Sequence, residues 1–273
     1  FPRLAALAEV AWTQPWHKNW RSFLVAMDKF NEHLSAKGIV FACSMYNIQH
    51  TVTPVNGKLQ VRLECERPDV EIRYTVDGKE PTDRSLLYKN PLMVTDTQTI
   101  KCATYRAGRQ MGKILTLPLA WNKATAKPVL GNKQAGKILV NGIRGSLRQS
   151  DFEWHSWESS DSVAFTIDLQ KKELLRSVSV GCITNYGMAA HKPADIEVWV
   201  SNNNRDYRKV SGKQFTDGEI FREGTFKEDV VLDLNKEIGR YVRIIAKGAG
   251  ECPATHVRPG QEARIYFDEV MIE

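Results

Sequence analysis

The spacing of apolar residues changes once along the chain, and this change constrains the fold more than any other feature. In the first 38 residues, apolar side chains recur at steps of three and four, the period of a helix with one buried face. From about Thr51 onward they alternate with polar residues in short runs, which is typical of half-buried strands. The sequence therefore predicts a short helical start followed by a mainly β protein.

Two helices are predicted at the start. Pro2 suits a first helical turn, and the apolar residues after it extend the helix to Trp12. Asn19 is a suitable N-cap for a second helix, whose single apolar stripe runs to Leu34 and ends before Gly38. Two such helices cannot bury both apolar faces against each other and still form a domain. We therefore interpret the chain as a piece of a longer protein, and expect the helices to pack on its missing part or on the next domain.

Short alternating runs with turn residues between them occupy the region after the helices. Asp77-Gly78 and Ala107-Gly108 suit tight turns between strands. Strands of this length and spacing predict a small sandwich of about seventy residues. The polar stretch 122–128 predicts a linker after it. The expected strands cover residues 59–63, 72–76, 99–104 and 114–121.

The remainder, from about residue 129 to 273, repeats the all-β pattern on a larger scale. No helical pattern of comparable strength intervenes. Antiparallel strands with long connections favour a jelly-roll sandwich over an up-and-down barrel. The expected strands cover residues 163–169, 175–180, 196–200, 230–234, 241–246 and 265–272.

Composition argues against several classes of protein. No apolar run approaches the roughly 18 residues of a membrane helix, so no membrane span is expected. The formal net charge is +6, but no basic stripe with interleaved aromatic residues points to a nucleic-acid partner. The five cysteines are scattered and include no C-x-x-C pair, which predicts neither a zinc knuckle nor a disulfide framework. Most of them are expected to be small buried apolar residues.

The helical start resembles one known family. Residues 1–13, with Pro2-Arg3 and Ala8-Glu9 before Trp12, resemble the closing stretch of the catalytic barrel in glycoside hydrolase family 20, the β-N-acetylhexosaminidases. The following helix to Leu34 is similar to the last barrel helix of that family. The similarity covers about forty residues, roughly the span of two helices and their connection.

The two β regions each resemble an accessory domain. Residues 72–82 and 99–103 resemble the chitobiase and hexosaminidase C-terminal domain, which is fibronectin-III-like. The third segment resembles an F5/8 type C, or discoidin-like, galactose-binding-type domain. The stretches that carry this second resemblance are residues 141–146, 154–157, 166–169, 240–243 and 267–270.

The resemblances imply a domain organisation and a parent activity. Residues 1–44 would be the last helices of a truncated (β/α)₈ barrel, residues 45–122 the fibronectin-III-like sandwich, and residues 129–273 the discoidin-like jelly roll. The parent would be a β-N-acetylhexosaminidase that hydrolyses terminal β-linked N-acetylhexosamine from glycans by a substrate-assisted, retaining mechanism without a catalytic cofactor. That family uses an adjacent Asp-Glu pair on an earlier barrel strand. We therefore expect no catalytic residue in this segment, and an inactive segment when it stands alone.

Two acidic pairs in the third region have the right residue types for such chemistry. They are Asp268-Glu269 and Glu228-Asp229. Strand alternation sends adjacent side chains to opposite faces, whereas paired catalysis requires one shared pocket. Neither pair is expected to be catalytic. No nucleophile elbow, zinc-protease helix or phosphate loop is found in the sequence.

Carbohydrate contacts are expected from loops of the third region, where aromatic faces and polar groups occur together. The candidate residues are Trp157, Tyr186, His256 and Arg258. Trp157 belongs to a Trp-x-x-Trp pattern for which packing is the alternative role. For His256 and Arg258, in an irregular stretch before the last strand, binding and structural roles are both open.

The discoidin-like resemblance also implies a structural Ca²⁺. Its candidate ligands are Asn141, Ser146 and Glu269, because Ca²⁺ prefers six to eight oxygen atoms. Asn141 stands where the family usually has Asp, which removes one negative charge. A hydrogen-bonded turn is the alternative for these residues.

Three functions follow as hypotheses. The segment supports the missing catalytic barrel of the same chain and binds glycans that contain N-acetylhexosamine, or it is a non-catalytic carbohydrate-binding or adhesion module, or it is a structural support without a ligand. Export to a periplasm or cell surface is implied by the resemblance alone. Five unpaired thiols argue mildly against an oxidising compartment.

Overall fold

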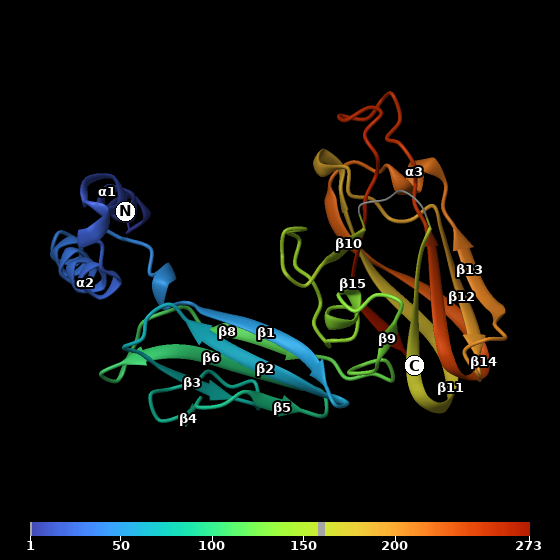
Figure 1. The fold of residues 1–273 in the computed structure, drawn as a ribbon, viewed down its shortest axis with the longest axis horizontal. Coiled ribbons are helices and arrows are strands. Elements are labelled where there is room, and N and C mark those ends of the chain that lie inside the picture. Colours follow the sequence, from blue (N-terminus) through green and yellow to red (C-terminus); the bar gives the residue numbers. More distant parts are fainter. Residues whose placement is uncertain (1, 158–161) are drawn as a thin grey trace.

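The computed structural model describes residues 2–157 and 162–273, which form a helical start and three β-sheets (Figure 1). The helices and the last sheet lie at opposite ends of a middle part. We call residues 48–119 the middle unit and residues 129–272 the third unit. The predicted mainly β architecture is confirmed. Within the described part of the chain, no helix is both long and apolar enough to cross a membrane.

Both predicted helices are present. α1 (Pro2–Trp12) is followed by a 3₁₀ turn (Pro15–His17) and by α2 (Trp20–Ala36). The N-cap of α2 is the predicted Asn19, whose Oδ1 accepts a hydrogen bond from the Ser22 amide at 3.1 Å. The start and end of each helix thus follow from local sequence.

A network of charged side chains fixes α2 to the middle unit. The guanidinium of Arg67 donates to Asp28 at 2.8 Å and to Asp69 at 2.7 Å, and only 2% of its side chain is exposed. Arg106 contacts both carboxylates at 2.9 Å, and the hydroxyl of Tyr46 donates to Asp28. The hydrogen bonds from Arg67 hold the pKa of Asp69 well below its ordinary value. Burial raises the pKa of Asp28, but the bonds from both arginines and Tyr46 leave it lowered.

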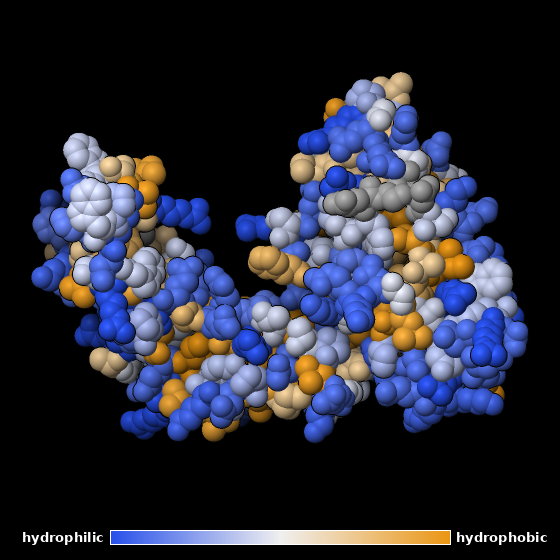
Figure 2. All heavy atoms as spheres, in the orientation of Figure 1, coloured by the Kyte–Doolittle hydropathy of each residue, from blue (hydrophilic) through white to orange (hydrophobic). Residues whose placement is uncertain are grey.

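Much of the apolar surface of the helices faces outward. Trp12 is 88% exposed and Leu7 is 63% exposed, whereas α2 buries Leu24 and Met27. Figure 2 shows apolar residues on the surface of this part of the molecule. Large exposed apolar patches usually mark a surface that contacts another body. The exposed apolar residues of α1, α2 and their connection are Leu4, Leu7, Val10, Trp12, Trp16, Trp20, Val25 and Phe30.

Two sheets pack face to face in the middle unit. One has the order β1-β2-β5, and the other has the order β4-β3-β6-β7 with β8 also paired to β6. Val61 of the first sheet and Ile100 of the second belong to the same buried core. The strands are β1 (Ile48–Val55), β2 (Lys58–Cys65), β3 (Glu71–Thr75), β4 (Leu86–Leu87), β5 (Leu92–Val94), β6 (Gln98–Arg106), β7 (Arg109–Gln110) and β8 (Leu115–Leu119).

The four strands predicted for the middle unit are present as β2, β3, β6 and β8. Strand β1 was not predicted, although its turn carries a sequence signal. Asn56 and Gly57, which join β1 to β2, have φ angles of 50° and 73°. Asn-Gly with positive φ at both positions is the preferred two-residue hairpin turn. The alternation of apolar and polar residues did not predict β1, because Pro54 interrupts that pattern.

The third unit is built around two strands of 23 residues each. β11 (Val163–Asn185) and β14 (Thr225–Lys247) pair along their lengths, with register shifts between Asp168 and Glu173 and between Leu175 and Ser177. These shifts divide the ladder into a part that lies beside β12 and a part that lies beside β15. One apolar core includes Phe165 from the first part and Val180 from the second. The other strands are β9 (Val129–Leu130), β10 (His155–Trp157), β12 (Asp195–Ser201), β13 (Arg208–Gln214) and β15 (Ile265–Ile272).

All six strands predicted for this region are present, but four of them are halves of β11 and β14. Short helical turns at Ala135–Lys137, Tyr186–Met188 and α3 (Asp217–Ile220) lie in the connections.

The middle and third units are joined by backbone hydrogen bonds and by a shared core. The Ala120 amide donates to Gly142 O at 2.9 Å, and the Ala126 amide donates to Val140 O at 2.9 Å. Ile143, from the third region of the sequence, packs in the core of the middle unit. The stretch predicted as a linker, 122–128, contains three fully or almost fully buried residues and is therefore packed rather than free.

Candidate functional site

Three of the four predicted carbohydrate-binding residues lie together at one end of the third unit. Tyr186 begins the 3₁₀ turn after β11, and His256 and Arg258 lie in the loop 248–264 between β14 and β15, which projects beyond the sheet (Figure 1). The rings of Tyr186 and His256 are 3.9 Å apart between centroids. Arg258 Nε donates to Gly187 O at 2.6 Å, which ties the loop to the turn. We call Tyr186, His256 and Arg258 the loop cluster.

Accessibility differs within the loop cluster. Tyr186 and Arg258 are partly exposed, and Met188 beside Arg258 is 47% exposed. His256 is only 3% exposed and lies beneath the Tyr186 ring. A ligand at this surface would therefore meet Tyr186 and Arg258 first, and His256 would support them.

A second histidine lies under the loop cluster. His191 is 1% exposed, its Nδ1 lies 3.0 Å from Ile220 O, and its Nε2 lies 3.2 Å from Nε2 of His256. Burial lowers the pKa of His191 to about 4 and also lowers the pKa of His256. Both rings are therefore neutral at pH 7. Nδ1 of His256 accepts a hydrogen bond from the Arg258 amide at 3.0 Å.

The fourth predicted residue, Trp157, occupies a different environment. It lies on β10, where its ring stacks on Phe165 with centroids 6.1 Å apart and meets the edge of Phe267 at 5.3 Å. These contacts attach Trp157 to the core of the third unit. The alternative role of core packing, which the sequence left open for this residue, accounts for its environment.

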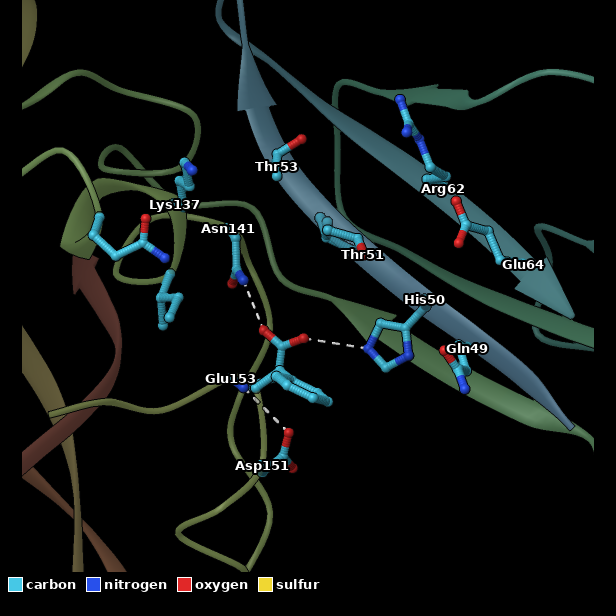
Figure 3. Close-up of a pocket in the computed structure, with 14 residues that line it drawn as sticks. Gln49, His50, Thr51, Thr53, Arg62, Glu64, Lys137, Asn141, Asp151 and Glu153 are labelled. Atoms are coloured by element: carbon cyan, nitrogen blue, oxygen red, sulfur yellow. Dashed lines mark hydrogen bonds and ion pairs between the residues drawn. The ribbon is translucent and has the colours of Figure 1, made fainter. Parts of the chain in front are cut away.

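A cavity of about 540 Å³ lies between the middle and third units, and sequence reasoning did not predict it. Figure 3 shows polar side chains of β1 and β2 on one side and residues of the 134–153 segment on the other. The volume lies within the range of small-ligand pockets. Phe152, which is 91% exposed, supplies an aromatic face at its edge.

Glu153 is the central side chain of this cavity. Its Oε1 lies 3.2 Å from Nε2 of His50 on β1, and its Oε2 accepts a hydrogen bond from Asn141 Nδ2 at 2.7 Å (Figure 3). The carboxylate thus connects a strand of the middle unit to a loop of the third. No local pattern could reveal this site, because His50 and Glu153 meet only through the packing of two units.

The three residues predicted to bind Ca²⁺ lie in or against the segment 141–146. Asn141 Oδ1 accepts from the Ile143 amide at 2.9 Å, and Ser146 Oγ accepts from the Arg148 amide at 3.1 Å. Glu269 Oε2 accepts from the Gly142 amide at 2.9 Å.

Each candidate oxygen faces an N–H donor, as the alternative of a hydrogen-bonded turn expects. Burial raises the pKa of Glu269 well above its ordinary value. The calcium site stays a prediction.

The pair Asp268-Glu269 departs from strict strand alternation. The β11–β15 register shifts between Val180 and Cys182, opposite this pair. Both carboxylates are fully buried, and they accept from amides of the same segment, Asp268 from Gly145 and Glu269 from Gly142. The predicted placement on opposite faces is therefore wrong, because the bulge turns both side chains toward the 141–146 segment.

Two family models match the chain. One, the chitobiase/beta-hexosaminidase C-terminal domain, matches residues 53–116, and the other, the F5/8 type C domain, matches residues 124–258. A relative named beta-hexosaminidase from Porphyromonas gingivalis is 30% identical over 122 residues. The match covers 42% of this chain, which spans about 15% of the length of that relative.

Solved structures with a related shape include two modules from Clostridium perfringens. CpGH89CBM32-5, in complex with GalNAc-β-1,3-galactose, is 15% identical and has a TM-score of 0.35, with 52% of this chain and 86% of that chain covered. CpGH89CBM32-4, in complex with GlcNAc-α-1,4-galactose, is 17% identical and has a TM-score of 0.36, with 56% of this chain and 94% of that chain covered.

The C-terminal domain of a chitobiase from Bacteroides fragilis is 12% identical, with a TM-score of 0.30 and with 48% of this chain and 76% of that chain covered. The two family models match successive parts of the chain and leave residues 117–123 between them. Residues 53–116 thus match the chitobiase/beta-hexosaminidase C-terminal domain family, and residues 124–258 match the F5/8 type C domain family.

Proposed function

We propose that this chain is the accessory C-terminal region of a β-N-acetylhexosaminidase that hydrolyses terminal β-linked N-acetylhexosamine, and that its third unit binds carbohydrate. The observation that carries the proposal is the order of the two domains on one chain, together with the 30% identity to a relative named beta-hexosaminidase. Catalysis would belong to a barrel outside this segment. The proposal places the whole enzyme outside the cytoplasm, in a periplasm or at a cell surface.

The helices support this proposal through their surface. Leu4, Leu7 and Trp12 expose more than half of their area, although α2 is held firmly by the Arg67 network. Helices that end a barrel would bury such a face against the preceding barrel strands and helices. The occupant we propose is therefore the catalytic barrel of the same protein.

For carbohydrate binding we propose the loop cluster, with direct contacts from Tyr186 and Arg258. An aromatic face packs on the C–H groups of a pyranose ring, and a guanidinium donates hydrogen bonds to hydroxyl or acetamido oxygens. Hydrogen bonds from Arg258 to Gly187 O and Gln261 hold its position before a ligand arrives. Such preorganisation reduces the entropy lost on binding. In this proposal Trp157 supports the strand β10 rather than touching sugar.

The carbohydrate proposal is tested with the purified chain and oligosaccharides that end in β-linked GlcNAc or GalNAc. Isothermal titration of Tyr186→Ala and Arg258→Ala is compared with two controls on other loops of the third unit, Tyr207→Ala and Arg148→Ala. We expect the first pair to lose at least about tenfold in affinity, equivalent to one good contact of about 1.4 kcal/mol. Unchanged affinity in both loop variants would exclude the loop cluster.

Phe152→Ala distinguishes the loop cluster from the cavity between the units. If Phe152→Ala abolishes binding while the loop variants retain it, the carbohydrate site lies at the cavity instead. Phe152 is 91% exposed, so its removal leaves the fold intact.

The enzymatic proposal is tested on the full-length parent with aryl N-acetyl-β-glucosaminide and aryl N-acetyl-β-galactosaminide. We expect turnover of at least one substrate by the parent and none by residues 1–273 alone. Absence of turnover of both substrates by the parent would exclude a hexosaminidase. The calcium prediction is tested separately, by thermal unfolding of the chain with Ca²⁺ and with EGTA.

A structural support without a ligand is a second candidate, favoured by the shared core at Ile143 and the backbone bonds at Gly142 and Ala126. Absence of binding across a broad glycan array, together with a less stable enzyme after deletion of the third unit, would favour the structural role. Glycan binding combined with an inactive parent would instead favour a binding or adhesion module.

A further inference from the structure

Three potential metal ligands meet beneath the loop cluster. They are His191, Cys252 and His256, and one ligand atom of each lies within 4.8 Å of those of the other two. All three side chains are at most 3% exposed. We call this group the His-Cys-His cluster.

The separation of the two histidines matches metal coordination. Ligand nitrogens at 2.0–2.1 Å from a tetrahedral zinc ion lie about 3.3–3.4 Å from each other. The two Nε2 atoms of His191 and His256 are 3.2 Å apart. The distance between the two nitrogens therefore suits one shared ion, once the proton between them is displaced.

The surroundings also fix the orientation of one ligand. Nδ1 of His191 lies 3.0 Å from the carbonyl oxygen of Ile220, so this nitrogen carries the proton and Nε2 presents its lone pair to the cluster. A backbone carbonyl behind a histidine is the usual outer partner of a metal ligand. Cys252 lies in a small apolar cluster with Ala189, Ala263 and Phe221.

The backbone brings Cys252 and His256 together in a closed loop. The Cys252 amide donates to Gln261 O at 2.8 Å, the Gly260 amide donates to Cys252 O at 2.9 Å, and the His256 amide donates to Pro253 O at 2.9 Å. The resulting spacing, Cys-x₃-His, places both side chains in one short loop. His191 comes from a different segment, before β12, so an ion would connect that segment to the loop.

We propose that His191 Nε2, Cys252 Sγ and His256 Nε2 bind one divalent transition-metal ion of the zinc class, with the fourth position open to water. Nitrogen and sulfur ligands favour zinc over Ca²⁺ or Mg²⁺. The ion would hold the loop that carries Arg258 against the segment that carries Tyr186. This site stands independently of the proposed carbohydrate function.

Metal binding changes the protonation of Cys252 and His256. Cys252 loses its thiol proton to solvent when Sγ binds the ion. In the metal-free protein Nδ1 of His256 accepts from the Arg258 amide, so its proton is on Nε2. Binding moves that proton to Nδ1, and the Arg258 amide loses this acceptor. One proton is therefore released for each ion bound, and the backbone near Arg258 shifts.

The test uses the full chain, stripped of metal with a chelator and kept reduced. Titration with Zn²⁺ in two buffers of different ionisation enthalpy should show one ion bound and one proton released per chain. Co²⁺ should produce the visible absorption of a tetrahedral complex and a thiolate-to-cobalt charge-transfer band. Zn²⁺ should also raise the melting temperature, because the folded chain brings the three ligands together and binds the ion more tightly than the unfolded chain does.

Matched variants assign the site. Cys252→Ser should remove the charge-transfer band, and His191→Gln should weaken Zn²⁺ binding at least about tenfold, the lower end of the effect of losing an outer partner. Cys43→Ser and His17→Gln, at exposed positions on the helical side of the molecule, should bind as the unchanged chain does.

The cobalt spectrum of the wild-type chain tests the proposal even if Cys252→Ser does not fold. Absence of the cobalt charge-transfer band in the folded wild type would overturn the proposal. Retention of the full band in Cys252→Ser, or its loss in Cys43→Ser, would also overturn it, because another thiol would then be the ligand.

Discussion

His50 on β1 and Glu153 in the third unit lie 3.2 Å apart between Nε2 and Oε1, and this pair closes one side of the cavity between the two units. The carboxylate is also held by Asn141 at 2.7 Å. One side chain thus links a loop of the third unit to a strand of the middle unit. The two units are therefore coupled by a buried polar contact in addition to their shared core.

The first prediction concerns Glu153→Ala. This change leaves the Asn141 amide without its acceptor and removes the contact with His50, so we expect a loss of about 1–3 kcal/mol in the free energy of unfolding. Equilibrium denaturation in urea measures the loss. Glu64→Ala, at an exposed position on the same cavity, is the control. Equal effects of the two changes would contradict the role given to Glu153.

A second prediction concerns Arg67→Ala. The buried guanidinium holds Asp28 of α2 and Asp69 of the middle unit, so its removal should loosen the helices from the sheet. We expect faster release of a fragment of residues 1–44 in limited proteolysis and about 1–3 kcal/mol lower stability. Arg62→Ala, at an exposed position on β2, serves as the control. A fragment released at the wild-type rate would show that the network does not attach α2.

The same network predicts a dependence on pH. The pKa values of Asp28 and Asp69 are lower in the folded chain than their ordinary value of 3.8. The stability that these two ionised carboxylates give the folded chain is therefore complete when the pH is above their ordinary pKa. It is lost as the pH falls through their lowered pKa values. Unfolding experiments between about pH 5 and pH 2 should show this loss, and Asp69→Asn should make it smaller. An unchanged slope in Asp69→Asn would assign the acid sensitivity to other carboxylates.

The fourth prediction concerns Gly181→Ala. A Cβ at this position would collide with the carboxylate of Asp268, which holds Arg144 and the Gly145 amide. We expect about 1–3 kcal/mol of destabilisation, as for other overpacked sites. Gly218→Ala is the control, because no atom lies within 4 Å of its added Cβ. Thermal unfolding of both variants tests whether the contact at Asp268 is as close as the structure indicates.

Local sequence predicted the elements of the fold well, because helix caps and alternation are local. Asn19 caps α2 as expected, and the strands that follow occur where alternating residues placed them. Whether two successive alternating runs form one continuous strand was harder to predict. Residues 163–169 and 175–180 belong to one strand because the ladder with β14 stops after Asp168 and resumes at Glu173, beyond the polar stretch.

The sites depended on contacts that no local pattern contains. Tyr186, His256 and Arg258 were predicted as a group and do lie together, because loops at one end of a sandwich converge. Trp157 was grouped with them by residue type, yet its ring packs on Phe165. The cysteine pattern excluded a zinc knuckle but could not indicate that Cys252 meets His191, since that contact requires the folded third unit.

The packing position of Ile143 affects how related proteins can exchange domains. Ile143 follows the stretch 122–128, the sequence boundary between the two domains. Its side chain nevertheless packs in the apolar core of the middle unit, which precedes that boundary. A recombination event at residues 122–128 would supply a foreign side chain to that interior. The two domains should therefore be inherited as a pair, and grafts between related proteins should succeed most often when both are transferred together.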